Sequence, residues 1–209
     1  MALRRLISTT ASSDRLEKLI AERLKPGSDK DLIDKRIWDL FGEDWCVMFS
    51  DLSGFSRGVE KFGIIHFLQT IYESERLLIP VIDRHDGILL KVEGDSFMVI
   101  FRNVTKAISA SIEMQKTLKV YNEGKNDEEQ VLLCLGLGFG KTLKIGDSDV
   151  FGAEVNAASK LGEDKAKAWE ILVTNSVKEQ AQGMSDIEFE AIEYCPPGAR
   201  GAYKVIYSL

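Results

Sequence analysis

The order of hydrophobic patterns along residues 45–139 constrains the fold of this chain more than any other feature. Short apolar runs, typical of strands, alternate with two longer segments in which apolar residues recur every three or four positions, as in amphipathic helices. In chain order we predict strand 46–49, helix 59–84, strand 88–92, strand 97–101, helix 104–121 and strand 131–139. A β-α-β-β-α-β order is typical of ferredoxin-like domains. We therefore predict an α+β, ferredoxin-like fold.

The remaining residues divide into an N-terminal extension and the end of the same domain. Within residues 1–44, which are rich in charge, Leu16, Ile20 and Leu24 recur at helical spacing until Pro26 interrupts the pattern. The other predicted elements are helices 31–41 and 153–162 and strands 171–174, 187–192 and 203–207. We predict a helical extension over residues 1–44 and one functional domain over residues 45–209.

Composition excludes several classes of protein. The net charge of −6 and pI near 5.1 argue against a broad nucleic-acid-binding surface. No apolar run reaches membrane-spanning length, and the N-terminus lacks the apolar stretch of a signal peptide. Cys46, Cys134 and Cys195 lie far apart, and the first two stand in apolar runs. We therefore predict buried, reduced thiols and a cytoplasmic protein.

Two aspartates stand where strand-like runs end or turn. Asp51 lies in Phe-Ser-Asp-Leu-Ser-Gly-Phe, residues 49–55, and Asp95 lies in Lys-Val-Glu-Gly-Asp-Ser-Phe-Met, residues 91–98. Two carboxylates brought together can hold hard cations such as Mg²⁺, which keep positions open for phosphate oxygens. A pair of such ions can clamp the attacking and leaving oxygens of a phosphoryl displacement. The two motifs therefore predict nucleotide chemistry.

With these motifs placed, residues 45–209 resemble the class III nucleotidyl cyclase family. Asp51 and Asp95 match the family's metal-binding aspartates. Lys91, four residues before Asp95, matches the base-selecting lysine of adenylate cyclases, and Asp149 matches the second base-selecting position. The resemblance therefore implies a nucleotide cyclase, with two Mg²⁺ or Mn²⁺ ions per site and a nucleoside triphosphate as substrate.

Three further positions follow from the same resemblance. Asn156 ends a segment that matches the family motif Asp-x-Trp-Gly-x-x-Val-Asn, in which the asparagine orients the ribose. Lys160 stands where the family usually has an arginine that stabilises the transition state, so the positive charge is kept and the planar fork is lost. Arg200, followed by glycine, resembles a Lys-Gly motif that grips the triphosphate.

The resemblance also implies how a site is assembled. Backbone N–H groups at the start of the long helix would cradle the phosphates; these belong to Leu52, Ser53, Gly54 and Phe55. In the family, the metal aspartates come from one chain and the base-selecting, ribose-orienting and transition-state residues come from its partner. Since this chain carries both sets, the resemblance implies a head-to-tail homodimer with two shared sites.

The substrate and the activity leave alternatives open. A lysine at position 91 favours ATP and disfavours GTP, for which the family usually carries glutamate, but a pyrimidine cyclase of the kind found in bacterial antiphage signalling fits the same residues. A catalytically silent nucleotide-binding module is a third hypothesis, which the two metal carboxylates argue against. Regulation would come from residues 1–44, a partner or a ligand that the sequence does not identify.

One glycine-rich segment imitates a phosphate-binding loop. Residues 136–142, Gly-Leu-Gly-Phe-Gly-Lys-Thr, end like a P-loop, but position 135, where the first glycine of that motif belongs, is leucine. The segment is also strand-like, with no long helix directly after it. We interpret it as a strand whose glycines allow close packing of the backbone.

Overall fold

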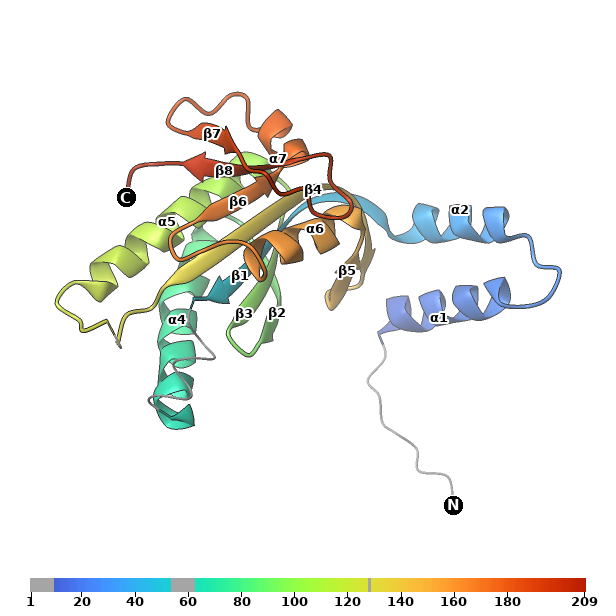
Figure 1. Ribbon diagram of the computed structural model, residues 1–209. Coiled ribbons are helices and arrows are strands. Elements are labelled where there is room, and N and C mark those ends of the chain that lie inside the picture. The colour runs from blue at the N-terminus through green and yellow to red at the C-terminus, as the bar shows by residue number, and fades with distance from the viewer. Residues whose placement is uncertain (1–9, 54–62, 128) are drawn as a thin grey trace, which may run out of the picture.

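The computed structural model describes residues 10–53, 63–127 and 129–209. Within these residues eight strands form one sheet in the order β2-β3-β1-β4-β6-β8-β7, with β5 paired to β4, as Figure 1 shows. The strands are β1 (Gly42–Leu52), β2 (Ile88–Glu93), β3 (Ser96–Phe101), β4 (Leu133–Ile145), β5 (Asp149–Phe151), β6 (Ile171–Thr174), β7 (Glu188–Ala191) and β8 (Ala202–Ile206). The first four lie as β4-β1-β3-β2 with antiparallel neighbours, which confirms the ferredoxin-like prediction.

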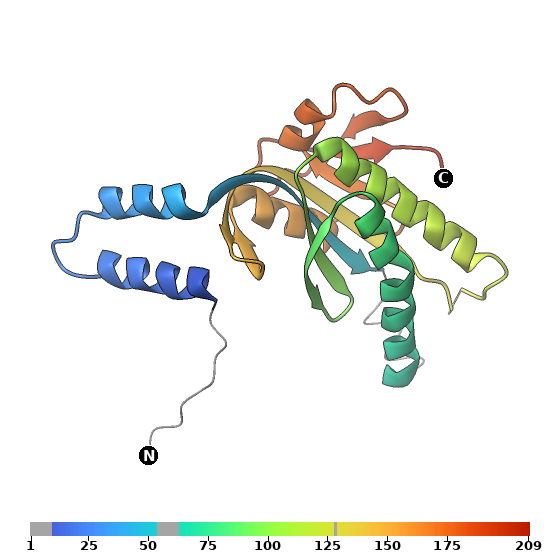
Figure 2. The same ribbon diagram turned by 180° about the vertical axis from the view of Figure 1, so that it is seen from behind.

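Helices cover both faces of this sheet. The described helices are α1 (Ala11–Arg23), α2 (Lys30–Phe41), α4 (Ile64–Arg84), α5 (Val104–Asn122), α6 (Ala153–Gly162) and α7 (Asn175–Gln180). Figure 2 shows α4 and α5 against one face, and Figure 1 shows α6 against the other. Strand β1 serves both layers because its side chains alternate. Cys46 and Met48 belong to the core beneath α4 and α5, whereas Val47 and Phe49 pack with α6.

The predicted boundaries differ from the structure in a few places. Strand β4 continues to Ile145 instead of ending at residue 139, because its polar residues pair with Gly42–Trp45 of β1. Backbone pairing therefore outweighs the loss of an apolar pattern there. The short elements β5 and α7 were not predicted. The start of the predicted helix 59–84 falls outside the described residues, and α4 is described from Ile64.

Residues 10–41 form a helical hairpin that extends from the sheet beside β5 (Figure 1). Two ion pairs join its helices, Arg23–Asp34 at 2.6 Å and Arg36–Glu22 at 2.7 Å. Helix α2 ends at Phe41 and β1 begins at the next residue. The extension is therefore joined to the sheet without an intervening loop.

The glycine-rich segment 136–142 lies within β4, which confirms the strand interpretation. A Cβ atom at Gly136 would lie 2.3 Å from the Ala158 carbonyl oxygen, and one at Gly138 would lie 2.3 Å from that of Glu154. These glycines therefore let α6 approach the sheet closely.

Cys46 and Cys134 are buried free thiols, and burial raises the pKa of both, that of Cys134 to about 11. Among the described helices, none is long and apolar enough to cross a membrane.

Candidate active site

Asp51 and Asp95 lie together at one edge of the β1–β3 ladder. Asp51 is the penultimate residue of β1, and Asp95 lies in the tight turn between β2 and β3. Gly94 has φ +62° in this turn, a conformation that glycine adopts without steric cost. The Ser96 hydroxyl, directly after the turn, donates to Asp51 Oδ1 at 3.4 Å. The structure thus brings the two predicted metal aspartates together.

The electrostatics of this pair suit a bound cation. Burial, together with the negative charge of Asp95, raises the pKa of Asp51 to about 6. Burial likewise raises the pKa of Asp95, although hydrogen bonding from the Leu52 backbone opposes the rise. The Asp95 Oδ2 atom is buried and has no hydrogen-bond partner in the described structure. A divalent cation would satisfy this orphaned oxygen and remove the cost of two adjacent carboxylates, so the residues fit such an ion.

The described residues contain no group of three or more histidine, cysteine or acidic side chains able to hold a metal by themselves. The site is therefore a carboxylate pair. Glu163, directly after α6, adds negative charge near both aspartates and raises their pKa values through this charge alone. A pair of this kind leaves cation coordination positions for phosphate and water oxygens.

Lys91 and Asp149 form an ion pair, although 58 residues separate them. Lys91 Nζ lies 2.7 Å from Asp149 Oδ2, and both side chains are about two-thirds buried or more. Lys91 comes from β2 and Asp149 from β5, the short strand that folds back on the end of β4. The Val150 N–H donates to Asp149 Oδ1 at 2.9 Å and fixes the carboxylate. The two predicted base-selecting residues are thus neighbours.

Helix α6 carries both predicted catalytic residues. Asn156 and Lys160 are one turn apart, and both are exposed. Lys160 Nζ forms an ion pair with Asp164 Oδ2 at 2.7 Å, and the hydrogen bond to Asp164 raises the pKa of Lys160. Because this pair is solvent-exposed, its cost of separation is small. A phosphate could therefore take the lysine from Asp164.

Glu154 was missed by the sequence analysis. Its carboxylate accepts hydrogen bonds from the Phe139 N–H at 3.2 Å, the Thr174 hydroxyl at 2.7 Å and the Ser176 hydroxyl at 3.0 Å. These donors belong to β4, β6 and α7, so Glu154 fixes the first turn of α6 against three elements. An acidic residue in the first turn also interacts favourably with the helix dipole. The signal that could have revealed Glu154 was an acidic residue in the first turn of the predicted helix 153–162.

The predicted phosphate contacts are only partly described. The Ser53 N–H already donates to the Leu132 carbonyl at 2.8 Å. Leu52 is the last residue of β1, and its backbone hydrogen-bonds the aspartate carboxylates, so neither Leu52 nor Ser53 offers a free N–H group to phosphate in the described structure. Gly54 and Phe55 lie outside the described residues, so their part of the cradle stays a prediction. Arg200 is exposed, and its backbone N–H donates to Asn175 Oδ1 at 2.9 Å. Its loop approaches α6, because a Cβ atom at Gly198 would lie 2.6 Å from the carbonyl oxygen of Ala153, the first residue of that helix.

Comparison with known proteins identifies the family. The family model described as the adenylate and guanylate cyclase catalytic domain matches residues 42–203. The chain belongs to this family. "Putative adenylate cyclase 3" of Rhizobium meliloti (strain 1021) is 24% identical over 144 residues, which cover 69% of this chain and 24% of that relative. "Serine/threonine-protein kinase pkn2" of Myxococcus xanthus is 27% identical over 135 residues, 65% of this chain and 16% of the kinase. The chain thus spans a small part of each relative.

Solved structures support the fold of this cyclase domain. The guanylyl cyclase Cya2 superimposes with a TM-score of 0.65 at 18% identity, over 79% of this chain and 93% of the other. The adenylyl cyclase CyaB from P. aeruginosa superimposes with a TM-score of 0.62 at 22% identity, over 80% and 96%. At these identities the likeness concerns the fold.

Asp51 and Asp149, one from each candidate pair, lie toward opposite ends of β4. Asp51 is the register partner of Cys134, near the start of the strand, whereas Asp149 is the partner of Ile145, its last residue. In the described part of the chain no ion pair joins the Asp51–Asp95 group to the Lys91–Asp149 group. The chain therefore carries two candidate charged pairs, Asp51–Asp95 and Lys91–Asp149.

Proposed function

We propose that this chain is a nucleotidyl cyclase that converts a nucleoside triphosphate, ATP foremost, into the 3′,5′-cyclic monophosphate and pyrophosphate. The observation that carries the proposal is the presence of both half-sites, Asp51–Asp95 and Lys91–Asp149, on one domain of the cyclase family. In this reaction the ribose 3′-oxygen forms a bond to the α-phosphorus. The bond from the α-phosphorus to the β-phosphate oxygen breaks, and the hydroxyl proton passes to solvent.

Each functional residue has a distinct task in this proposal. Asp51 and Asp95 would hold two Mg²⁺ or Mn²⁺ ions, which when bound supply charge neutralisation for the triphosphate and acidify the ribose hydroxyl. Asn156, exposed on α6, would hydrogen-bond the ribose and orient its 3′-oxygen. Lys160 would leave Asp164 and neutralise charge that develops on the α-phosphate.

Base selection is assigned to the Lys91–Asp149 pair. Their mutual contact uses one ammonium proton and one carboxylate oxygen, so the pair keeps further donors and acceptors for a base. Adenine offers a ring acceptor for Lys91 and an exocyclic amine for Asp149. Guanine reverses that edge, and a site with unpaired polar groups rejects such a ligand by roughly 10⁴-fold. Cytosine offers the same pattern as adenine, so a pyrimidine cyclase is the second candidate.

The complete site is proposed to form between two chains. Asp51 and Asp149, one from each half-site, lie toward opposite ends of β4, and among the described residues no ion pair joins the two half-sites. In a head-to-tail homodimer, the Asp51–Asp95 group of one chain would face the Lys91–Asp149 group of its partner. Asn156 and Lys160 would come from the same chain as Lys91.

The test is to incubate the purified protein with each of the four nucleoside triphosphates and Mn²⁺ and to identify the products by mass. We expect cyclic AMP and pyrophosphate, with ATP giving the highest kcat/KM. The Asp95→Asn variant keeps the side-chain shape and removes the charge, so it is the inactive control. A higher kcat/KM for CTP or UTP would favour the pyrimidine cyclase. Nucleotide binding without any cyclic product would refute the proposal and favour the silent module.

A further inference from the structure

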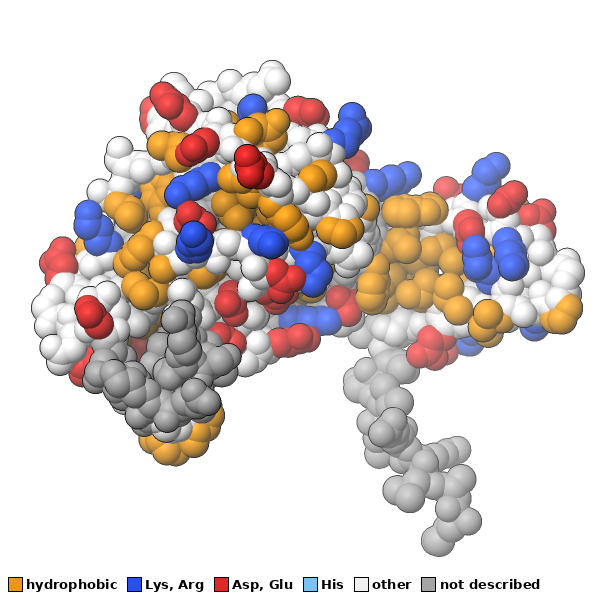
Figure 3. All heavy atoms as spheres, in the orientation of Figure 1, with side chains coloured by type: hydrophobic (Ala, Val, Ile, Leu, Met, Phe, Trp, Pro, Cys, Tyr) orange, Lys and Arg blue, Asp and Glu red, His pale blue; other side chains and the backbone are white. Residues whose placement is uncertain are grey.

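The helical hairpin of α1 and α2 packs on the part of the sheet that carries Asp149. We call residues 143–151, the end of β4 with its turn and β5, the β4–β5 arm. Ile145 of this arm shares a buried cluster with hairpin residues. The other members are Leu19, Ile33, Ile37 and Phe41, with Leu16 and Leu143 at the edge. Figure 3 shows hydrophobic side chains gathered on the hairpin where it meets the domain.

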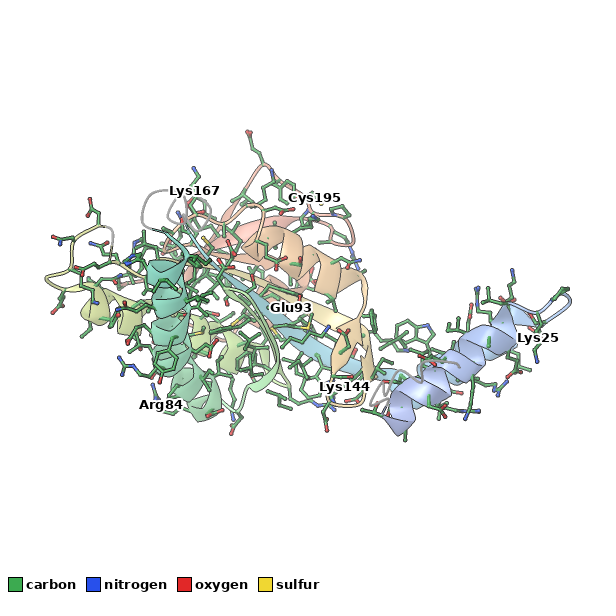
Figure 4. All side chains as sticks on the ribbon, turned by 90° about the horizontal axis from the view of Figure 1, so that it is seen from below. Lys25, Arg84, Glu93, Lys144, Lys167 and Cys195 are labelled. Carbon is green, nitrogen blue, oxygen red and sulfur yellow. The ribbon has the colours of Figure 1, made fainter. Side chains whose placement is uncertain are left out.

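A second contact joins the hairpin to the turn of the arm. Gly146 has φ +58°, and a Cβ atom there would lie 3.4 Å from Thr10 Oγ1 and 3.7 Å from Ser12 Cβ. Thr10 is the N-cap of α1, so the first turn of that helix lies against the arm. In Figure 4, Lys144 of β4 lies beside the hairpin, and Lys25 lies at the hairpin's far end.

The arm connects the hairpin cluster with the Lys91–Asp149 ion pair. Ile145 and Asp149 are register partners in the β4–β5 ladder. Beyond that ladder, β5 is anchored through Val150, which packs into the cluster beneath α6. Asp149 therefore stands between two supports, the hairpin cluster at Ile145 and the α6 cluster at Val150. Loss of the first would let the carboxylate move relative to Lys91 on β2.

We propose that the α1–α2 hairpin is part of the base-selecting apparatus, in which Leu19 and its cluster act as positioning residues through Asp149. This inference rests on the proposed function, because it assigns base selection to the Lys91–Asp149 pair. It gives the N-terminal extension a task within the catalytic unit. Leu19 is fully buried and Ile145 is 4% exposed, so removing Leu19 side-chain atoms leaves a cavity beside Ile145.

The decisive variant is Leu19→Ala, which changes the hairpin and leaves the arm's own sequence intact. We expect the ratio of kcat/KM for ATP over GTP to fall by about tenfold, the value of one hydrogen bond to a charged group. The loss should appear in KM for ATP, with kcat at saturation within about twofold. Leu19→Met, which conserves volume, should restore the ratio. Ile108→Ala is the matched control, since Ile108 is equally buried but belongs to α5 and packs in the main core, away from the hairpin cluster.

A double-mutant cycle identifies the route of the effect. In the Asp149→Ala background, Leu19→Ala should cause no further loss of base discrimination, because the residue through which it acts is gone. An additive loss would overturn the proposal. If Leu19→Ala does not fold, Leu16→Ala removes a less buried side chain at the edge of the same cluster and takes its place.

Amide hydrogen exchange tests the contact without any catalytic activity. Leu19→Ala should speed exchange in residues 143–151 and leave the core of α5 unchanged. Unchanged exchange in the arm, or unchanged discrimination with a lowered melting temperature, would mean that the hairpin is merely appended, and would overturn the proposal. If the wild-type protein forms no cyclic nucleotide, the proposed function fails, while the exchange measurement still decides whether the hairpin braces the arm.

Discussion

Replacing Asp51 by asparagine should stabilise the metal-free protein at pH 8. The native pKa of Asp51 is about 6, above its ordinary value of 3.8, because the carboxyl is buried beside Asp95. A raised pKa means that the folded state favours the protonated form, so ionisation costs stability. The penalty is absent below pH 3.8, grows between pH 3.8 and 6, and is complete above pH 6.

The size of the gain follows from this shift. About two pKa units correspond to roughly 3 kcal/mol of unfolding free energy, at about 1.4 kcal/mol per unit. Asp51 keeps some contact with water, which screens its charge, so we expect about 1–2 kcal/mol. For a chain of this size that raises the melting temperature by about 3–6 °C. Asparagine keeps the side-chain shape and an oxygen that can accept from Ser96.

The assay is thermal or urea unfolding of wild-type protein and Asp51→Asn in EDTA between pH 4 and pH 8. The difference should be complete at pH 8 and vanish near pH 4. Asp44→Asn is the matched control, because Asp44 is exposed on the same strand and its replacement should change little. Millimolar Mn²⁺ should then stabilise the wild type and not Asp51→Asn. Equal stabilities at pH 8, or a gain that persists unchanged at pH 4, would refute the reasoning.

Three further outcomes are expected. Lys160→Arg should raise kcat severalfold with little change in KM, because the planar guanidinium of arginine contacts the transition state better than an ammonium group. Reduced activity on this change would contradict the role assigned to Lys160. Mixing Asp51→Ala chains with Asn156→Ala chains should restore cyclase activity, because a heterodimer of the two would contain one intact site. If the subunits exchange and activity does not recover, each site lies within one chain. The double substitution Lys91→Glu and Asp149→Ser should lower the ratio of kcat/KM for ATP to that for GTP at least tenfold, because it removes the donor and the acceptor proposed to contact adenine. Steady-state kinetics with both substrates measures this ratio.

Much of the fold could be predicted because its signals are local. The two amphipathic helices and the strand pairs show their periodicity within a few residues, and each buries an apolar face that the sequence displays. The boundaries of α6 and β6 agree with the prediction for the same reason. β5 could not be predicted in this way, since three residues carry no periodicity and its strand conformation depends on pairing with β4.

The sequence by itself singled out Asp51 and Asp95, because each stands where a strand-like run ends or turns, but their meeting depends on the pairing of β1 with β3. It also supplied Lys91 and Asp149 as separate matches. The tertiary structure alone brought those two within 2.7 Å and packed the N-terminal hairpin against the arm that carries Asp149. The physical reason is that such contacts depend on strand register and on cores formed by distant segments, and neither is encoded in the pattern of any one segment.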